Sequence, residues 1–283
     1  MDPTMRLPAS VLDELDAQAA GSREAAPLRE AASVILLRDG DAGLELFLML
    51  RHATMAFASG MAVFPGGGVD GRDFEDAPAV VGPGLDEWAG VLGTTPLMAG
   101  AVLCAAIREL FEETGILLAG SADAIVTNTD SAEWESRRVR LENHELSMSE
   151  VLRETGLSLR TDLLRFWSEW STPTFEPRRY KTWFFIAVQP AGQPTRAVAS
   201  EALEVRWMRV DEALQDVEAG RARMLPPQYC TCLELAAAGS AAIILGSEHV
   251  PVRVAPTVDV DDNGAYLVLP PRFLALGAAR PTG

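Results

Sequence analysis

Three glutamates, Glu109, Glu112 and Glu113, stand at helical spacing i, i+3 and i+4 near the middle of the chain. On a helix this spacing puts all three carboxylates on one face. Gly115 is placed to end that helix, so the acids crowd the negative end of the helix dipole. Each like-charge pair then costs about 0.2–0.5 kcal/mol in an isolated helix. A divalent cation would offset the repulsion, and Mg²⁺ prefers carboxylate oxygens, so the spacing predicts a metal site.

The helix that carries these acids is predicted to begin at Pro96, with Thr95 as its N-cap. Strands are expected upstream at 33–38, 44–50 and 61–64, and a short helix at 85–92. Downstream, residues 121–165 are expected to be helical, 174–190 and 204–208 to form strands, and 210–219 and 226–235 to form helices. This order predicts an α/β (α+β) fold in which a mixed sheet lies between helices.

A run of three glycines, Gly66 to Gly68, follows the short strand at 61–64 and Pro65. Consecutive glycines cost conformational entropy. The run therefore indicates either a sharp turn or a ligand that approaches the backbone closely.

Composition excludes several classes of partner. The chain has 283 residues, 48% of them hydrophobic, and a formal net charge of −16. That charge argues against nucleic acid and against anionic membranes, which both require clustered Lys and Arg. Three cysteines, Cys104, Cys230 and Cys232, lack the spacing of a zinc site and are expected to be reduced thiols. With no readable targeting segment, a cytoplasmic location is expected.

The segment Arg108-Glu109-Leu110-Phe111-Glu112-Glu113-Thr114-Gly115-Ile116, preceded at a distance by Gly67, resembles the Nudix box, G-x5-E-x7-R-E-U-x-E-E-x-G-U with U apolar. The second half matches at every fixed position. The first half departs, because Asp73 stands where the box has glutamate and about 27 residues are inserted after it. The resemblance implies a Nudix fold with helical insertions and a metal-dependent hydrolase of diphosphate linkages.

The inserted box is similar to that of the Nudix subfamily related to the coenzyme A diphosphatases. Arg51, Gly60 and the run Phe64-Pro65-Gly66-Gly67 keep the spacing of that subfamily's preceding motif. His52 and Met55 stand where the motif has Ser and Leu. The resemblance covers roughly residues 30–235.

The resemblance also implies roles for individual residues. Mg²⁺ or Mn²⁺ is expected on Glu109, Glu112, Glu113 and the carbonyl of Gly67. Catalysis is expected from Glu109 as ligand or general base, from Glu112, and from Arg108, which would orient a carboxylate. Substrate binding is expected from Arg51, Gly66, Arg178 and Arg179. Three acids remain further candidates for the metal: Asp73, for which a structural salt bridge is the alternative, Glu201 and Glu204.

The predicted organisation is an N-terminal extension (1–30), a Nudix domain (31–240) and a C-terminal extension (241–283) that packs on the domain. The domain contains an insertion at about 74–95 and a helical segment at about 121–165. The predicted activity is cleavage of CoA or acyl-CoA to 3′,5′-ADP and (acyl-)phosphopantetheine. Two alternatives stay open: a Nudix pyrophosphatase for ADP-ribose, NADH or another nucleoside diphosphate derivative, and a non-catalytic ligand sensor. The expected partner is a small-molecule diphosphate, and a homodimer is left open.

Overall fold

A computed structural model describes residues 5–51, 58, 60–196 and 202–280. Within this part of the chain, eight strands form one sheet: β1 (Leu28–Gly40), β2 (Gly43–Arg51), β3 (Ala62–Val63), β4 (Gly66–Gly68), β8 (Arg165–Ser171), β9 (Arg179–Val188), β10 (Ala202–Arg209) and β11 (Val252–Val254). Their order is β10-β2-β1-β9-β8-β11, with β3 paired to β2 and β4 to β1. The sheet is mixed, because β1–β9 and β8–β11 are parallel pairs and β1–β2 and β8–β9 are antiparallel.

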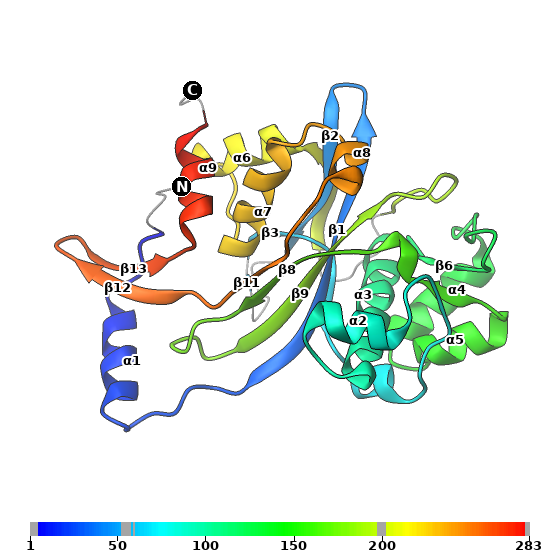
Figure 1. The fold of residues 1–283 in the computed structure, drawn as a ribbon, viewed down its shortest axis with the longest axis horizontal. Coiled ribbons are helices and arrows are strands. Elements are labelled where there is room, and N and C mark those ends of the chain that lie inside the picture. The colour runs from blue at the N-terminus through cyan, green and yellow to red at the C-terminus, as the bar shows by residue number, and fades with distance from the viewer. Residues whose placement is uncertain (1–4, 52–57, 59, 197–201, 281–283) are drawn as a thin grey trace.

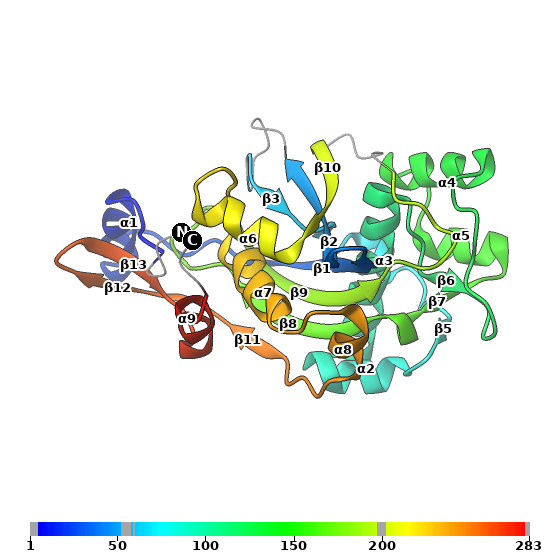
Figure 2. The same ribbon diagram turned by 90° about the horizontal axis from the view of Figure 1, so that it is seen from above.

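Helices cover both faces of this sheet (Figures 1 and 2). Helices α2 (Leu85–Leu92) and α3 (Pro96–Thr114) pack on one face, and α6 (Val210–Glu218) and α7 (Pro226–Ala236) on the other. Strand β1 alternates between the two apolar clusters, with Val34 and Leu36 in one and Ile35 and Leu37 in the other. Such burial on both faces requires a continuous apolar run. The predicted sheet between helices is confirmed.

Helix α3 begins and ends where the sequence predicts. The Thr95 side chain accepts a hydrogen bond from the Met98 N–H at 3.2 Å, and Pro96 opens the helix. Gly115 ends it in the left-handed conformation, with φ of 78°. Most of the helix is buried between its neighbours, so its acidic last turns are held inside the fold rather than on an open surface.

The stretch predicted to be helical from 121 to 165 is helical only in part. It contains α4 (Ala132–Glu142) and α5 (Met148–Thr155), but also the short strand β7 (Ser158–Arg160). Gly156 ends α5 in the left-handed conformation, and the chain then joins a small sheet with β5 (Val80–Val81) and β6 (Ala119–Gly120). Two 3₁₀ turns complete the region, η1 (Gly71–Phe74) and η2 (Thr161–Leu163).

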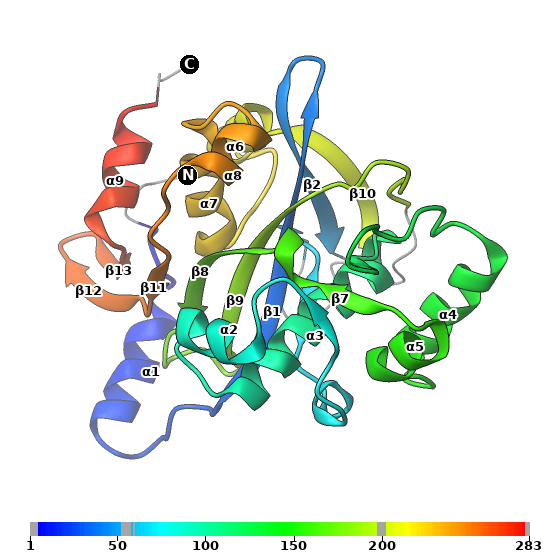
Figure 3. The same ribbon diagram turned by 45° about the vertical axis from the view of Figure 1, so that its right-hand side comes forward.

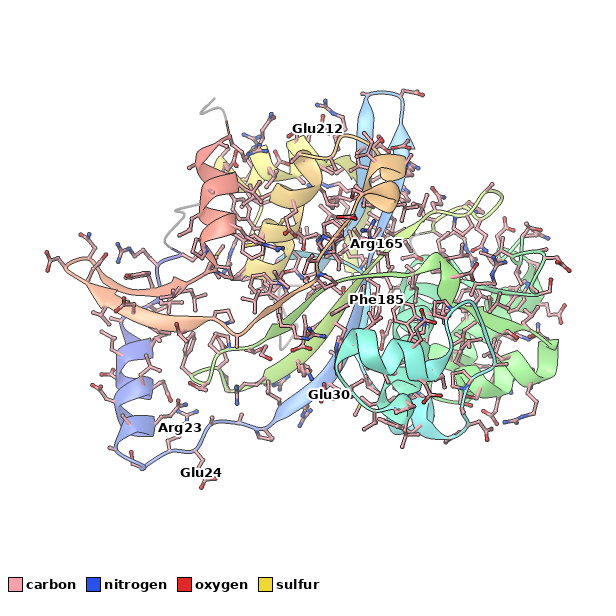
Figure 4. All side chains as sticks on the ribbon, viewed as in Figure 1. Arg23, Glu24, Glu30, Arg165, Phe185 and Glu212 are labelled. Atoms are coloured by element: carbon pink, nitrogen blue, oxygen red, sulfur yellow. The ribbon has the colours of Figure 1, made fainter. Side chains whose placement is uncertain are left out.

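The two ends of the chain lie together at one side of the sheet (Figures 1 and 3). Helix α1 (Ser10–Ala19) follows residues 5–9. The C-terminal segment contains α8 (Ala241–Gly246), the strands β11, β12 (Thr257–Asp261) and β13 (Gly264–Val268), and α9 (Pro271–Ala278). Neither α8 nor α9 was expected from the sequence. Arg165, labelled in Figure 4, donates to the carbonyls of Leu245, within α8, and of Ser247, just after it, and so holds α8 on the sheet.

No single helix in the described part of the chain is long and apolar enough to cross a bilayer. The pair α2 and α3 passes that test by length and composition only when taken together, and its axes bend by 88°.

Candidate active site

The last turns of α3 bring the three predicted carboxylates to one buried edge of the sheet. Glu112 and Glu113 are less than a tenth exposed, and Glu109 is partly buried. All three line the same cavity. The helical spacing places them on one face, and the apolar face of α3 anchors that end of the helix in the core.

The glycine run lies directly against these carboxylates. Strand β4 pairs with β1 through Gly66–Ser33 and Gly68–Ala31, and the Gly66 N–H donates to Glu113 Oε2 at 2.7 Å. A Cβ on Gly67 would stand 2.4 Å from Glu109 Oε1, so a side chain there would displace the Glu109 carboxylate. The glycine run was expected to allow either a sharp turn or the close approach of a ligand, and the group that lies close to it here is the Glu109 carboxylate. The two halves of the interrupted box therefore meet in space.

Arg108 links the carboxylates to one another. Its guanidinium donates to Asp73 at 3.0 and 3.1 Å, to Glu109 at 2.8 Å and to Glu112 at 3.2 Å. It also donates to the Gly68 carbonyl at 3.1 Å. Burial opposes the charge on Arg108, but the neighbouring carboxylates outweigh burial and raise its pKa. A buried cation with this many charge-assisted bonds fixes the positions of the acids around it.

Asp73 faces Arg108 rather than the other acids. It is 2% exposed and also accepts a hydrogen bond from the Asp70 N–H at 2.8 Å, which closes the first turn of η1. This geometry agrees with the interpretation of Asp73 as a structural salt bridge.

Glu112 is the electrostatically strained member of the set. Burial raises its pKa to about 7, while Arg108 lowers it and Glu109 raises it further. Its Oε1 atom is buried without a hydrogen-bond partner among the described residues. A buried carboxylate oxygen in that position is stabilised by a cation, so the donor chemistry at this edge fits a hard divalent ion.

The carboxylates are not arranged around one shared position that a metal ion could occupy. Among the described residues, no group of three or more His, Cys, Asp or Glu side chains has the geometry of a metal cage. Mg²⁺ retains several waters and takes part of its coordination from substrate phosphates. A partial set of protein ligands is therefore compatible with this ion, and which residues bind it stays a prediction.

The cavity beside the carboxylates has a volume of about 1050 Å³. Its acidic end is formed by α3, β4 and His144, and its floor by β1, β9 and β8. Aromatic side chains line the remainder, among them Phe64, Trp170, Phe175 and Phe184. A volume of this order accommodates a ligand far larger than a diphosphate group.

Several predicted site residues do not join the carboxylates. Arg179 donates instead to the carbonyls of Thr172, Pro173 and Ala26, and neither it nor the exposed Arg178 lines the cavity. Alternation along β9 turns Arg179 away from the face that carries Tyr180 and Thr182. Glu204 lies exposed on β10, outside this cavity. Glu201 and the side chain of Arg51 fall outside the described residues.

Two cavity residues were missed at the sequence level. Arg223 is exposed at the cavity wall, and Gln228 is buried in the first turn of α7. Both flank Leu225-Pro226-Pro227, a segment that resembles one in the CoA diphosphatase-like subfamily. That motif was the available signal, but only the fold shows that it borders the same cavity as α3.

Comparison with known proteins agrees with this fold and site. Residues 94–235, about half of the chain, match the NUDT19 Nudix domain family. A solved structure of a NUDIX hydrolase from Alicyclobacillus acidocaldarius aligns with a TM-score of 0.66 and 25% identity, covering 79% of this chain and 98% of that one. The chain therefore belongs to the NUDT19 Nudix domain family, within the Nudix hydrolases. The predicted class of protein, a Nudix hydrolase of the CoA diphosphatase-like subfamily, is confirmed.

Individual relatives are more distant. A Caenorhabditis elegans protein whose name assigns it to the nudix hydrolases is 30% identical over 201 residues, or 71% of this chain and 58% of that protein. The acyl-coenzyme A diphosphatase NUDT19 of Xenopus laevis is 26% identical over 220 residues, or 65% of this chain and 58% of that protein. The human protein of the same name is 26% identical over 234 residues. The chain thus spans about three fifths of the length of these relatives.

Proposed function

We propose that this protein hydrolyses the diphosphate linkage of CoA or acyl-CoA, releasing 3′,5′-ADP and phosphopantetheine or its acylated form. The observation that carries the proposal is the meeting of Glu109, Glu112 and Glu113 with Gly66 and Gly67 at one end of a long cavity. Relatives named acyl-coenzyme A diphosphatases support the choice of substrate.

Each residue has a role that follows from its contacts. Glu109 is the proposed general base, because it is the most exposed of the three acids and Arg108 holds it. Arg108 is a positioning residue, since its bonds reach Glu109, Glu112 and Asp73 together. Arg223 is the cavity-lining cation proposed to contact a substrate phosphate.

Mg²⁺ or Mn²⁺ is the proposed cofactor, and Glu109, Glu112, Glu113 and the Gly67 carbonyl are the residues that would hold it. When bound, the ion would neutralise the diphosphate and make the attacking water more acidic. The unpartnered Oε1 of buried Glu112 supports this assignment.

A cytoplasmic location and a small-molecule substrate stay predictions. The three cysteines are free and buried, which suits a reducing compartment. Whether the protein forms a homodimer is likewise open to measurement.

The test is turnover of CoA, hexanoyl-CoA, ADP-ribose and NADH with Mg²⁺, with products resolved by chromatography. Wild-type protein should release 3′,5′-ADP from CoA, and Glu113→Gln should lower kcat by at least about 100-fold, on the scale of losing one group that stabilises transition-state charge. Circular dichroism and Tm of the variant should show an intact fold. Preference for ADP-ribose or NADH would replace the CoA assignment, and no turnover of any substrate would favour a ligand sensor.

A further inference from the structure

The cavity extends well beyond the carboxylates. Its floor crosses four neighbouring strands, β4, β1, β9 and β8, at one level, as the pairs Ala31–Gly68, Ala31–Thr182 and Thr182–Trp170 show. Three strand spacings correspond to roughly 14 Å. A diphosphate held at the β4 end would leave the β9 and β8 end for another part of the substrate.

The far wall of the cavity is built from the two ends of the chain. We call residues 5–7 together with residues 252–268 the terminal strap. Its two parts are joined by hydrogen bonds from the Leu7 N–H to the Ala265 carbonyl at 2.9 Å and from the Leu267 N–H to the Met5 carbonyl at 3.3 Å. Arg6 adds an ion pair with Asp261 at 2.5 Å. Leu7, Pro256 and Leu267 line the cavity, and the strap lies outside the matched range 94–235.

The strap is attached to the cavity floor. Strand β11 pairs with β8 through Val254 and Trp170, and the Trp170 ring lies 5.7 Å from that of Phe273 in α9. Trp170 therefore contacts both the C-terminal segment and the cavity. Figure 3 shows β11 and β8 side by side next to α9.

Gln228 is an unsatisfied polar group in the wall of the same cavity. It is 6% exposed, it lines the cavity, and its Oε1 atom is buried without a hydrogen-bond partner in the described part of the chain. Most buried side-chain amides are paired, and leaving one unpaired is costly. The amide is therefore placed to bond a ligand that carries a hydrogen-bonding group of its own.

We propose that the part of the cavity between Gln228 and the terminal strap is a binding subsite. It would hold the phosphopantetheine arm of the substrate, which ends in the sulfur atom and any acyl group bonded to it. Gln228 pairs with an amide of that arm, and Leu267 and Leu7 contact its apolar tip. Phosphopantetheine is an extended chain with two amides, which offer both donors and acceptors. The inference rests on the proposed function for the identity of the ligand, while the subsite itself rests on Gln228 and the strap.

The first experiment measures binding without turnover. Isothermal titration calorimetry of phosphopantetheine and, separately, of 3′,5′-ADP is run on wild type and Gln228→Met, which keeps the length of the side chain. The Kd for phosphopantetheine should rise about three- to tenfold, the loss expected for one neutral hydrogen bond, with no such change for 3′,5′-ADP. Because the variant removes an unpaired buried oxygen, its Tm should rise.

Gln193→Met is the matched control. Gln193 is 1% exposed and bonds the Leu117 N–H and carbonyl and the Val126 carbonyl at 2.8, 3.0 and 2.6 Å. This substitution should lower Tm, the signature of a structural glutamine. If Gln228→Met lowers Tm in the same way and leaves phosphopantetheine binding unchanged, the subsite proposal is wrong.

The second experiment addresses the strap. Leu267→Trp puts a larger side chain in the far wall and so leaves less space for an acyl chain. The ratio of kcat/KM for hexadecanoyl-CoA to kcat/KM for CoA should therefore fall by about tenfold, within the range for one poorly fitting apolar group. An unchanged ratio would overturn the role of the strap. The outcomes also separate the two proposals. If wild type hydrolyses CoA but Gln228→Met binds phosphopantetheine as tightly as wild type does, the subsite proposal alone is wrong. Weakened phosphopantetheine binding without CoA turnover refutes the proposed reaction alone.

Discussion

At the scale of single residues, two buried arginines, Arg108 and Arg138, balance the charge of the acidic end of α3. Arg108 bonds Asp73, Glu109 and Glu112 from within the box. Arg138, contributed by α4, donates to the Glu112 carbonyl at 2.9 Å, at the negative end of α3. The two buried arginines therefore hold this end of α3 in place. The Oε1 atom of Glu112 keeps no hydrogen-bond partner among the described residues and can bind a ligand.

Asp73→Ala should lower the free energy of unfolding by about 3–5 kcal/mol, because it leaves Arg108 charged, buried and short of its main partner. Urea unfolding followed by fluorescence measures the change. Asp76→Ala is the control, since Asp76 pairs with Arg153 on the surface and should cost less than about 1 kcal/mol. Equal losses in the two variants would contradict a structural role for the buried pair.

Gly66→Ala and Gly67→Ala should differ in what they damage. A Cβ at Gly66 would stand 2.4 Å from the Ala32 carbonyl oxygen and 2.6 Å from Ser33 Cα, which are backbone atoms of β1. Gly66→Ala should therefore lower stability by about 1–3 kcal/mol or more.

A Cβ at Gly67 meets the Glu109 carboxylate, which is the end of a side chain and can move. Gly67→Ala should keep most of its Tm but lower kcat by about 100-fold, because a misplacement of this size next to the reacting groups has that effect. Thermal unfolding and turnover on one preparation separate the two. A fully active Gly67→Ala protein would show that Glu109 does not need its observed position.

At the scale of elements, the box is assembled from parts that lie far apart in the chain. Helix α3 carries the acids, β4 brings the glycines, and α4, which follows the box in the chain, supports the C-terminal end of α3. The insertion that interrupts the box thus stays outside the site. It packs as α2 against the sheet, where Trp88 contacts Phe185, labelled in Figure 4, with ring centroids 6.0 Å apart.

Arg138→Met should lower the free energy of unfolding by about 1.5–3 kcal/mol, the range for a hydrogen bond to a charged group, because the Glu112 carbonyl loses its buried donor. Chemical denaturation measures the loss. Arg140→Met, on the same helix and partly exposed, should change stability by less than about 0.5 kcal/mol. A similar loss in both variants would mean that α4 contributes by general packing alone.

At the scale of the whole molecule, the terminal segments complete one side of the sheet. The C-terminal segment adds β11 to β8 and stacks His249 on Trp167 with ring centroids 3.6 Å apart. His249 Nε2 lies 2.7 Å from the Trp167 carbonyl oxygen. Attachment of this segment to the core therefore includes a half-buried histidine.

Stability should fall on acidification through this contact. Burial lowers the pKa of His249, with the nearby charges of Arg165 and Arg272 acting in the same direction and the bond to Trp167 opposing them. Below the ordinary pKa of 6.5, the unfolded chain binds a proton that the folded protein does not, so unfolding becomes more favourable as the pH falls. The Tm of wild type should therefore drop more between pH 7.5 and 5.5 than that of His249→Gln. An identical drop in both proteins would remove His249 as the cause.

The sequence by itself determined the elements and the chemistry they carry. Thr95, Pro96 and Gly115 set the ends of α3, and the spacing of its glutamates set their common face, because both depend on neighbours within a few residues. The order of the elements also predicted a mixed sheet between helices. The strand after Gly156 was not predicted, since β7 forms only by pairing with β5 and β6 from elsewhere in the chain.

Only the tertiary structure decided which residues share the cavity. It placed Gly67 against Glu109, paired Asp73 with Arg108, and turned Arg179 toward backbone carbonyls. It also brought Gln228 and Leu267 into the wall of the cavity that the acids line. The physical reason is the separation in sequence of the residues involved. Helix ends and side-chain faces follow from local backbone geometry. A cavity instead depends on strand order and on packing between segments that are up to 260 residues apart, as Leu7 and Leu267 are.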